Sequence, residues 1–272
     1  PAFAQDENGN YRYHQLSPEQ LAGIGKLQDF SRTGSRELTA GDYVHQIKRL
    51  AHPGIHSPLY GFMQELIVGL GEFGDQLRKS ETTPALGQLP ELELAGVRAL
   101  DRYRYEITIK GSYPQFIYWL AMPFFAPVPV EADLFYSQPG LKKKNITLDW
   151  YPVGTGPYLL AVNDPNRKML LQRNPNFHGE NFPDEGEPQD RANGLFHDAG
   201  QPLPFIDQVL FTLEKESIPV WNKFLQGYYD VSGIASDSFD QVVSFGPGGD
   251  IDLSQAMQDK GIGLQTTIKP ST

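Results

Sequence analysis

The first strongly patterned segment of the chain has apolar residues at helical spacing and opens at Thr39. Its apolar positions are Tyr43, Val44, Ile47, Leu50 and Ala51. This spacing places them on one face of a helix. Thr39 and Asp42 put a hydroxyl three residues before a carboxylate, a variant of the capping box that also suits the helix dipole. The pattern therefore predicts a helix that begins at Thr39 and stops at His52-Pro53-Gly54.

Before and after this helix the spacing of apolar and polar residues changes several times. Residues 1–36 are rich in polar residues and glycine and predict irregular structure. Phe62 to Leu70 keeps helical spacing, and the next twenty residues, 71–90, are expected to form a loop. Strict alternation over residues 103–110 predicts a half-buried strand that pairs with Val97-Arg98-Ala99-Leu100 across a turn. Pro114 then opens a short aromatic helix through Leu120.

The second half of the chain has the pattern of strands joined by turns. Tyr158 to Val162 and Met169 to Gln172 are short apolar runs separated by Asn163-Asp164-Pro165-Asn166, which predicts a hairpin. Residues 179–204 form a polar excursion rich in glycine and proline.

The order of the next segments is typical of a crossover between parallel strands. We expect a strand at Ile206–Leu213, a helix at Ile218–Leu225 and a second strand at Tyr229–Ser232, joined in the right-handed sense. The remaining expected elements are helices near Ser238–Ser244 and Ser254–Lys260 and a last strand at Ile262–Ile268. We expect a domain boundary near residue 130, with a peripheral α+β domain over residues 1–130 and part of an α/β lobe over residues 131–272.

Composition narrows the possible classes of function. The hydrophobic fraction of 39% and the aromatic fraction of 12% are typical of a packed globular protein. No run approaches the ~18 apolar residues of a membrane span. The formal charge of -10 argues against nucleic acid as a partner and suits a soluble monomer. The basic run Lys142-Lys143-Lys144 is interpreted as a solvated patch, and the absence of cysteine excludes disulfides and thiol chemistry.

No segment carries the pattern of a catalytic, metal or cofactor site. His52 and His56 have ligand-like spacing, but Pro53 and Gly54 break the helix that would align them. The acidic cluster over residues 184–190 does not match a calcium loop. The glycine-rich stretches at residues 154–156 and 246–250 lack the other residues of nucleotide-binding loops. We therefore expect no catalytic residue, no metal and no cofactor, and we do not expect an enzyme.

Three sets of short motifs follow one another along nearly the whole chain. The first set is Arg36-Glu37-Leu38-Thr39-Ala40-Gly41-Asp42-Tyr43-Val44, followed by Ile47-Lys48-Arg49-Leu50. The second is Val153-Gly154-Thr155-Gly156-Pro157-Tyr158 with Arg173-Asn174-Pro175-Asn176-Phe177, and the third is Ile206-Asp207-Gln208-Val209 with Gly227-Tyr228-Tyr229-Asp230-Val231. Together they resemble motifs of the bacterial extracellular solute-binding proteins of family 5, the dipeptide- and oligopeptide-binding receptors of ABC transporters. The motif residues expected to be structural are Thr39, Asp42, Gly154, Gly156, Pro157, Tyr158, Arg173, Asn174, Pro175 and Asp230.

The resemblance implies a mixed α/β fold like that of a class II periplasmic binding protein. The chain would hold a peripheral domain and part of the first lobe, without the second lobe. It also implies the substrate-binding component of an ABC importer, which captures extended oligopeptides between two lobes and delivers them to an inner-membrane permease. By position against the family, the residues expected to approach the ligand are Ser57, Tyr60, Gly233, Ile234 and Ala235.

Several alternatives stay open at this stage. The ligand could be an oligosaccharide, a nickel complex or haem, since the family hosts several solutes. A hydrolase with its site outside this chain, or a signalling or surface-interaction domain, is a further alternative. Ala2-Phe3-Ala4 has the small-x-small pattern of a signal cleavage site, but no positively charged or apolar segment precedes it. We expect a periplasmic protein of which this chain is a middle piece, and we expect such a piece to bind peptide poorly.

Overall fold

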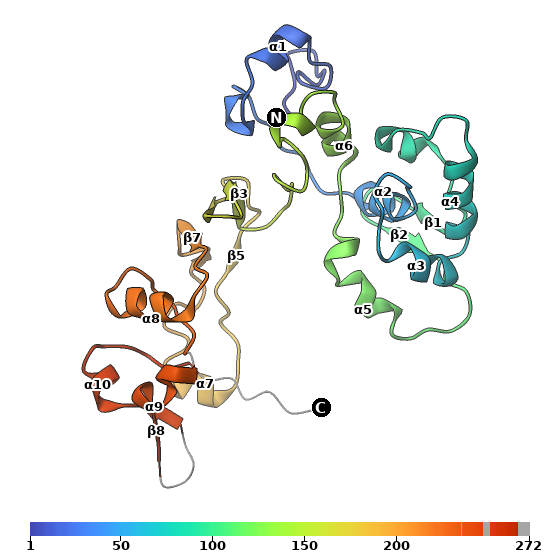
Figure 1. Cartoon of the computed structure of the whole chain (residues 1–272). Coiled ribbons are helices and arrows are strands. Elements are labelled where there is room, and N and C mark those ends of the chain that lie inside the picture. The colour runs from blue at the N-terminus through green and yellow to red at the C-terminus, as the bar shows by residue number, and fades with distance from the viewer. Residues whose placement is uncertain (235, 247–250, 266–272) are drawn as a thin grey trace. The chain divides into compact units, whose positions relative to one another are not determined.

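The computed structural model describes residues 1–234, 236–246 and 251–265 (Figure 1). It combines short helices with short strands, so the mixed α and β character expected from the sequence is present. Contacts within the chain define two compact units. The first holds Pro1–Asp164 and Met169–Leu210, and the second holds Pro165–Lys168 and Phe211–Thr272. The domain ranges 1–130 and 131–272 stay predictions.

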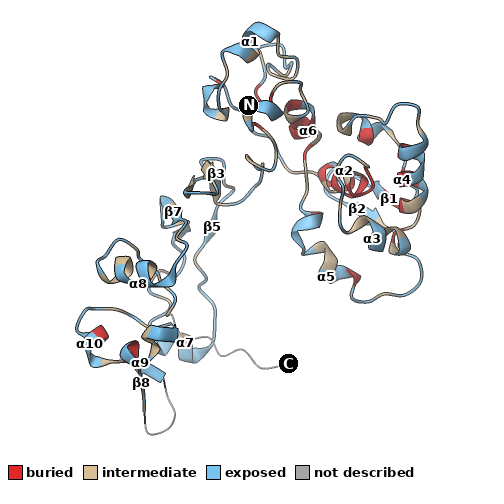
Figure 2. Ribbon diagram, in the orientation of Figure 1, coloured by how far each residue is buried: buried red, intermediate tan, exposed pale blue. Residues whose placement is uncertain are grey.

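The largest hydrophobic core in the described part of the chain lies in the first unit, where four helices pack with a hairpin. The elements are α2 (Ala40–Leu50), α3 (Tyr60–Leu66), α4 (Leu70–Lys79), β1 (Val97–Ala99), β2 (Tyr105–Ile107) and α5 (Phe116–Leu120). Buried residues gather on α2 and α4 (Figure 2). Among the side chains that are fully buried here are those of Met63, Ile67, Leu70 and Leu89.

The predicted helix at Thr39 and the predicted hairpin are both confirmed. Thr39 is the N-cap of α2, and Asp42 accepts a hydrogen bond from the Thr39 backbone N–H at 2.8 Å. The strands β1 and β2 pair antiparallel, with Val97 opposite Ile107. The expected aromatic helix also forms, as α5, and the turn η3 (Pro123–Phe125) follows it.

The prediction of a loop over residues 71–90 is wrong. α3 ends at Leu66, and a second helix, α4, begins at Leu70 after Gly69, whose φ of 77° is left-handed. Phe73 and Leu77 lie one turn and two turns beyond Leu70 and are buried with it, so this segment has an apolar face that favours a helix. The turn η2 (Leu86–Glu91) occupies the end of the same stretch.

A smaller core joins the N-terminal segment to residues 130–146. The short helix α1 (Pro18–Ala22) and the turn η1 (Leu27–Asp29) lie near α6 (Val130–Tyr136) and the turn η4 (Lys142–Lys144). Phe30 and Phe135 meet edge to face at 5.2 Å in this core. Lys144 was expected to be solvated, but its ammonium donates to the carbonyls of Leu21 and Ile24, so it ties η4 to the N-terminal segment.

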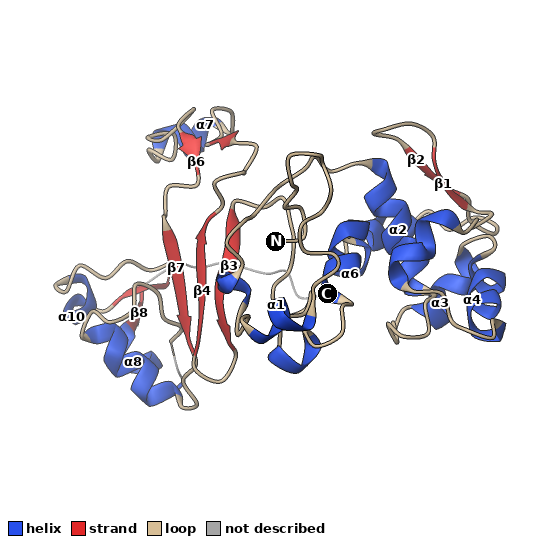
Figure 3. Cartoon of the chain, turned by 90° about the horizontal axis from the view of Figure 1, so that it is seen from above, coloured by secondary structure: helices blue, strands red, loops and turns tan. Residues whose placement is uncertain are grey.

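A three-stranded sheet follows. Its strands are β3 (Tyr158–Asp164), β4 (Lys168–Arg173) and β7 (Gln208–Thr212), in the order β3-β4-β7 (Figure 3). The predicted hairpin is thus confirmed as β3 and β4. The excursion over residues 179–204 is mostly irregular but is closed at its base by β5 (Glu180–Asn181) paired with β6 (Pro202–Leu203), and it contains α7 (Pro188–Ala192).

The second unit has a small core around Trp221 of α8 (Ser217–Leu225). The other elements there are η5 (Ser236–Ser238), α9 (Phe239–Val242), β8 (Val243–Phe245), β9 (Ile251–Leu253) and α10 (Gln255–Gln258). β8 and β9 form an antiparallel hairpin that replaces the end of the helix expected near Ser238–Ser244.

The prediction of a strand at Tyr229–Ser232 is wrong, so the parallel crossover does not form among the described residues. Instead, side-chain contacts hold this segment. The Tyr229 hydroxyl donates to the Glu214 carboxylate at 2.7 Å and accepts from Thr212 at 2.9 Å. Of the last expected strand, residues 262–265 are not strand, and residues 266–268 lie outside the described residues. Nowhere in the described residues does a helix reach the length and apolarity needed to cross a membrane.

Candidate functional site

The second set of motifs meets the third set where β3 begins, β4 ends and β7 approaches. We call this place the signature corner and define it as Gly156, Pro157, Tyr158, Arg173, Asn174, Ile206 and Asp207. Asn174 donates from its backbone N–H to the Pro157 carbonyl at 2.8 Å and from its side-chain amide to the Gly156 carbonyl at 2.9 Å. Its side-chain oxygen accepts from the Asn176 N–H at 3.0 Å, which shapes the turn after β4.

The same corner reaches β7 through Arg173 and Tyr158. The Arg173 N–H donates to the Asp207 carbonyl at 2.9 Å, and its guanidinium lies 3.0 Å from the Asp207 carboxylate. The Tyr158 hydroxyl donates to the Ile206 carbonyl at 2.8 Å. Motif residues that lie far apart in sequence therefore contact one another directly. Gly154 and Pro175 flank the corner and are exposed.

A small apolar cavity of about 270 Å³ opens beside the signature corner. Its lining residues are Pro157, Tyr158, Phe177, Glu180, Leu203, Pro204, Phe205 and Ile206. Glu180 is the one charged group among them, and none of these side chains is a nucleophile paired with a base. The cavity can hold a small apolar group but has no arrangement for acid–base or nucleophilic chemistry.

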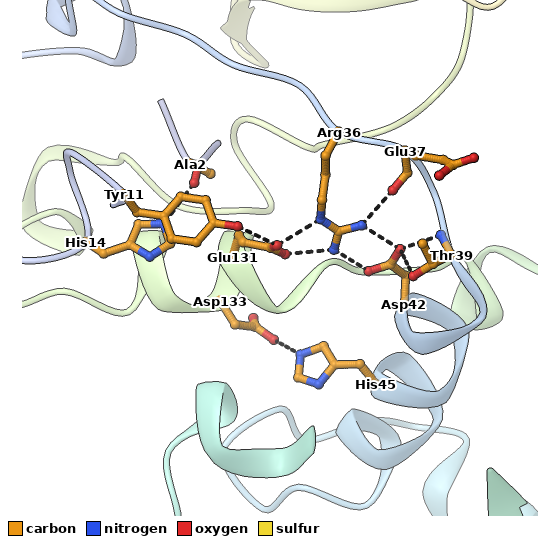
Figure 4. A network of polar contacts seen from close by, with 10 residues as sticks. All are labelled: Ala2, Tyr11, His14, Arg36, Glu37, Thr39, Asp42, His45, Glu131 and Asp133. Carbon is orange, nitrogen blue, oxygen red and sulfur yellow. Dashed lines mark hydrogen bonds and ion pairs between the residues drawn. The ribbon is translucent and has the colours of Figure 1, made fainter. Parts of the chain in front are cut away.

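The first motif takes part in a buried polar network between α2 and α6 (Figure 4). We call it the α2–α6 network and define it as Tyr11, Arg36, Asp42, His45, Arg49, Glu131 and Asp133. At its centre the Arg36 guanidinium bridges two carboxylates, at 2.5 Å from Asp42 and 2.7 Å from Glu131. The Tyr11 hydroxyl donates to Glu131 at 2.9 Å, so the N-terminal segment joins the same network.

Charge pairing outweighs burial in setting the ionisation of this centre. Burial by itself opposes ionisation of Asp42 and Glu131 and is the largest single influence on each. Hydrogen bonds from Arg36 to both, from the Thr39 N–H to Asp42 and from Tyr11 to Glu131 together lower the pKa of both carboxyl groups below the usual range. These hydrogen bonds with the two carboxylates raise the pKa of Arg36. The centre is therefore one cation between two anions at neutral pH.

A second ion-pair group lies one turn further along α2. His45 Nε2 is 2.7 Å from the Asp133 carboxylate, and both side chains are buried. Arg49 Nε lies 2.8 Å from the same carboxylate, at an angle outside the range of a hydrogen bond. The guanidinium and carboxylate charges of the α2–α6 network all have partners within the chain, so the network holds the fold together. His45 Nδ1 is buried without a hydrogen-bond partner in the described residues.

Ser57 and Tyr60, both expected near the ligand, lie at the start of α3 in the first unit. The Tyr60 ring packs under the Arg78 guanidinium at 5.1 Å, and its hydroxyl accepts from Arg78 at 2.9 Å. Ser57 Oγ is buried without a hydrogen-bond partner in the described residues, while its carbonyl accepts from the Tyr60 N–H. These contacts are all with the chain itself, and a role at the ligand stays a prediction for both.

Gly233 and Ile234 lie in the second unit, and Ala235 falls outside the described residues. Ile234 packs against the core around Trp221, whereas Gly233 is exposed with open space around it. Asp230, one of the motif residues, is exposed. Ser57 and Tyr60 thus belong to one unit and Gly233 and Ile234 to the other.

No cluster of three or more metal-ligating side chains occurs among the residues that the structure describes. His52, the first of the two spaced histidines, uses both ring nitrogens within the chain. Nε2 lies 2.9 Å from the Pro84 carbonyl, and Nδ1 accepts from the Gly54 N–H at 3.1 Å. His52 therefore fixes the turn that ends α2 and has no nitrogen free for a metal.

Sequence reasoning found the capping role of Asp42 but missed its ion pair with Arg36 and the whole contribution of α6. The six-residue spacing from Arg36 to Asp42 was a usable signal, because an arginine just before an acidic N-cap turn can fold back onto it. Glu131 and Asp133 carried no such local signal, since Glu131 lies 95 residues from Arg36.

Comparison with known proteins agrees with the motifs. The family model described as "Bacterial extracellular solute-binding proteins, family 5 Middle" matches residues 33–267. The periplasmic oligopeptide-binding protein OppA of Salmonella typhimurium is 29% identical over 140 residues, which cover 52% of this chain and 23% of that protein. The chain thus spans about a quarter of the length of this curated relative.

Two solved structures resemble the chain in fold. OppA of Burkholderia pseudomallei has a TM-score of 0.50 at 20% identity, covering 76% of this chain and 33% of that chain. The substrate-binding domain of an oligopeptide ABC transporter from Bacillus anthracis also has a TM-score of 0.50, at 19% identity, covering 76% of this chain and 32% of that chain. The expected fold, a mixed α and β fragment of the fold seen in these binding proteins, is confirmed. Since the family model matches most of its length, the chain belongs to the bacterial extracellular solute-binding proteins of family 5.

Proposed function

We propose that this chain is part of the substrate-binding component of an ABC importer that captures extended oligopeptides and delivers them to a membrane permease. The family match over residues 33–267 carries the proposal. The relatives and solved structures that the chain resembles are described as oligopeptide-binding proteins. Those proteins bind solutes, and we propose that this one binds and does not catalyse.

The site of capture is proposed to lie between two lobes that close about a hinge. In this arrangement the peptide is held largely by its backbone, as in other proteins that bind extended peptides, and water in the side-chain pockets tolerates varied sequences. Ser57, Tyr60, Gly233, Ile234 and Ala235 are the proposed contacts of this chain with the peptide. The signature corner and the α2–α6 network are proposed to support the fold without contacting the peptide, because their charged groups already have partners within the chain.

The proposed setting is the periplasm, with the protein acting as a monomer that meets its permease at the inner membrane. The relative from Salmonella typhimurium is described as periplasmic. The net charge of -10 keeps such a protein soluble and apart from other copies. No cofactor and no nucleic acid take part in the proposed function.

Native mass spectrometry tests the proposal directly. The protein is expressed from its complete gene, purified without denaturation and sprayed from a volatile buffer. We expect a ladder of non-covalent adducts in the mass range of short peptides, lost on acid unfolding and readable as peptides by sequencing. A single non-peptide adduct would move the function to another solute of the same family, and a bare protein that also ignores a peptide mixture would refute peptide binding.

A further inference from the structure

The apolar cavity beside the signature corner is lined by aromatic rings and by one carboxylate. Its volume of about 270 Å³ lies just below the usual range of ligand pockets, ~300–1,000 Å³, so it suits a small group. The rings are those of Tyr158, Phe177 and Phe205, from the start of β3, the segment after β4 and the segment before β7. Glu180 of β5 supplies the carboxylate, and all four residues belong to the first unit.

Two of the three rings are held in place by contacts within the chain. The Tyr158 hydroxyl donates to the Ile206 carbonyl at 2.8 Å, which anchors the far end of its ring. The Phe205 ring stacks on Phe182, with 6.0 Å between the ring centroids, and is still 45% exposed. Rings that are fixed in this way lose little conformational entropy when a ligand binds against them.

The cavity offers negative charge but few free hydrogen-bond acceptors. The carbonyls of Pro157, Phe205 and Ile206, all lining residues, already accept hydrogen bonds from groups of the signature corner. His178 Nε2 lies 3.6 Å from the Glu180 carboxylate, but these side chains are 63% and 65% exposed, so the pair is weak and leaves the carboxylate open to another cation.

We propose that this cavity binds a trimethylammonium group, the cationic end of choline and of related small molecules. A primary ammonium would lose water here without enough acceptors to replace it, which costs free energy. A trimethylammonium group has no N–H to satisfy, its methyl groups suit an apolar lining, and its charge is attracted both by aromatic rings and by the Glu180 carboxylate. This inference goes beyond the proposed function and does not depend on peptide capture.

Choline and its uncharged analogue, in which a tert-butyl group replaces the trimethylammonium group, test the proposal. Each is titrated into the protein expressed from its complete gene, and binding is followed by saturation-transfer NMR of the ligand, which suits weak ligands of large proteins. The cavity variants are Glu180→Gln and Phe177→Leu. The matched controls are Glu185→Gln and Phe196→Leu, which change an exposed carboxylate and a half-buried ring outside the cavity. Circular dichroism and thermal unfolding check the fold of every variant.

We expect choline to bind more tightly than the analogue, and each cavity variant to weaken choline binding about two- to five-fold, the factor given by exposed cation–π and ion-pair strengths. Glu180→Gln should leave binding of the uncharged analogue unchanged, because it removes charge and no apolar surface. The controls should bind both ligands like the wild type. Equal affinity for choline and the analogue, no saturable choline binding, or choline binding that is unchanged in both cavity variants would overturn the inference.

Vesicle flotation distinguishes a free ligand from a lipid headgroup. Phosphatidylcholine carries the trimethylammonium group and phosphatidylglycerol does not. Flotation with phosphatidylcholine vesicles alone, lost in Glu180→Gln, would assign the headgroup as the source, whereas choline binding without flotation would assign a free small molecule; either result supports the proposed group.

The inference and the proposed function fail separately. A protein that binds peptides but not choline would overturn the inference and leave peptide capture standing. A protein that binds choline but ignores a peptide mixture would overturn peptide capture and leave the inference standing.

Discussion

Replacing Arg36 with methionine is the sharpest test of the α2–α6 network. The methionine keeps much of the apolar stem and removes the guanidinium, which makes hydrogen bonds to Asp42 at 2.5 and 2.9 Å and to Glu131 at 2.7 and 2.8 Å. The two carboxylates are about 5% and 10% exposed, so the variant leaves two anions buried with little water to replace the lost cation.

The expected loss of unfolding free energy follows from that burial. Removing one partner of a buried ion pair costs ~3–5 kcal/mol, because the other charge stays buried and unpaired. We place Arg36→Met near the low end, at about 3 kcal/mol, for two reasons. The Arg36 side chain is itself 28% exposed, and each carboxylate keeps another donor, the Thr39 N–H for Asp42 and the Tyr11 hydroxyl for Glu131.

Urea unfolding followed by circular dichroism measures the loss, and hydrogen exchange of α6 locates it. We expect a lower urea midpoint and faster exchange over Val130–Tyr136. The control is Arg102→Met, which removes an exposed arginine from an ion pair with Glu37 and should change little. If Arg36→Met were as stable as Arg102→Met, the network would not stabilise the join between α2 and α6, and the argument from burial would be wrong.

Three further predictions follow from the same structure. The pKa values of Asp42 and Glu131 are lowered in the folded protein, so the stability that these carboxylates contribute is complete above their unfolded pKa values near ~4. This contribution is lost as the pH falls through the lower folded pKa values. Urea midpoints measured from pH 7 to pH 2 should therefore drop less steeply in Arg36→Met than in wild type. Asn174→Ala removes two hydrogen bonds of the signature corner and should cost about 1–2 kcal/mol, seen as faster hydrogen exchange at the ends of β3 and β4; exchange equal to wild type would show that the side chain is not needed there. Leu89→Ala empties a fully buried position and should cost about 2–5 kcal/mol in urea unfolding, whereas the exposed Val231→Ala should be near neutral.

The elements that could be predicted from sequence are those whose cause lies within a few residues. The helix α2 has its cap, its apolar face and its stop within Thr39–Gly54, and the hairpin of β3 and β4 has a strong turn between two apolar runs. The helix α4 was missed from the sequence for a related reason. Its start depends on the left-handed Gly69. A glycine at that place predicts the end of one helix, but it does not show whether a second helix begins directly after it.

The strand expected at Tyr229–Ser232 failed because its apolar residues have a different use. A short apolar run predicts a strand only if a partner strand accepts its backbone, and the described residues offer none here. Tyr229 instead turns its hydroxyl toward Glu214 and Thr212, a contact across 15 and 17 residues that no local pattern carries. Glu131 and Asp133 were missed on the same grounds, since their partners Arg36 and His45 lie 95 and 88 residues away.

The signature corner explains why short motifs identify the family although the polar side chains of Asn174 and Arg173 are already bonded within the chain. Asn174 donates hydrogen bonds from its backbone N–H and its side-chain amide to the start of β3, and its side-chain oxygen accepts one in the turn after β4. Arg173 contacts Asp207 through its backbone N–H and its guanidinium. The side-chain bonds among these require an asparagine and an arginine at those positions, so the corner imposes a strict local pattern on the sequence. A peptide that is held by its backbone imposes no such pattern on the residues around it. The motifs are therefore strong evidence for the fold and weak evidence for the identity of the ligand.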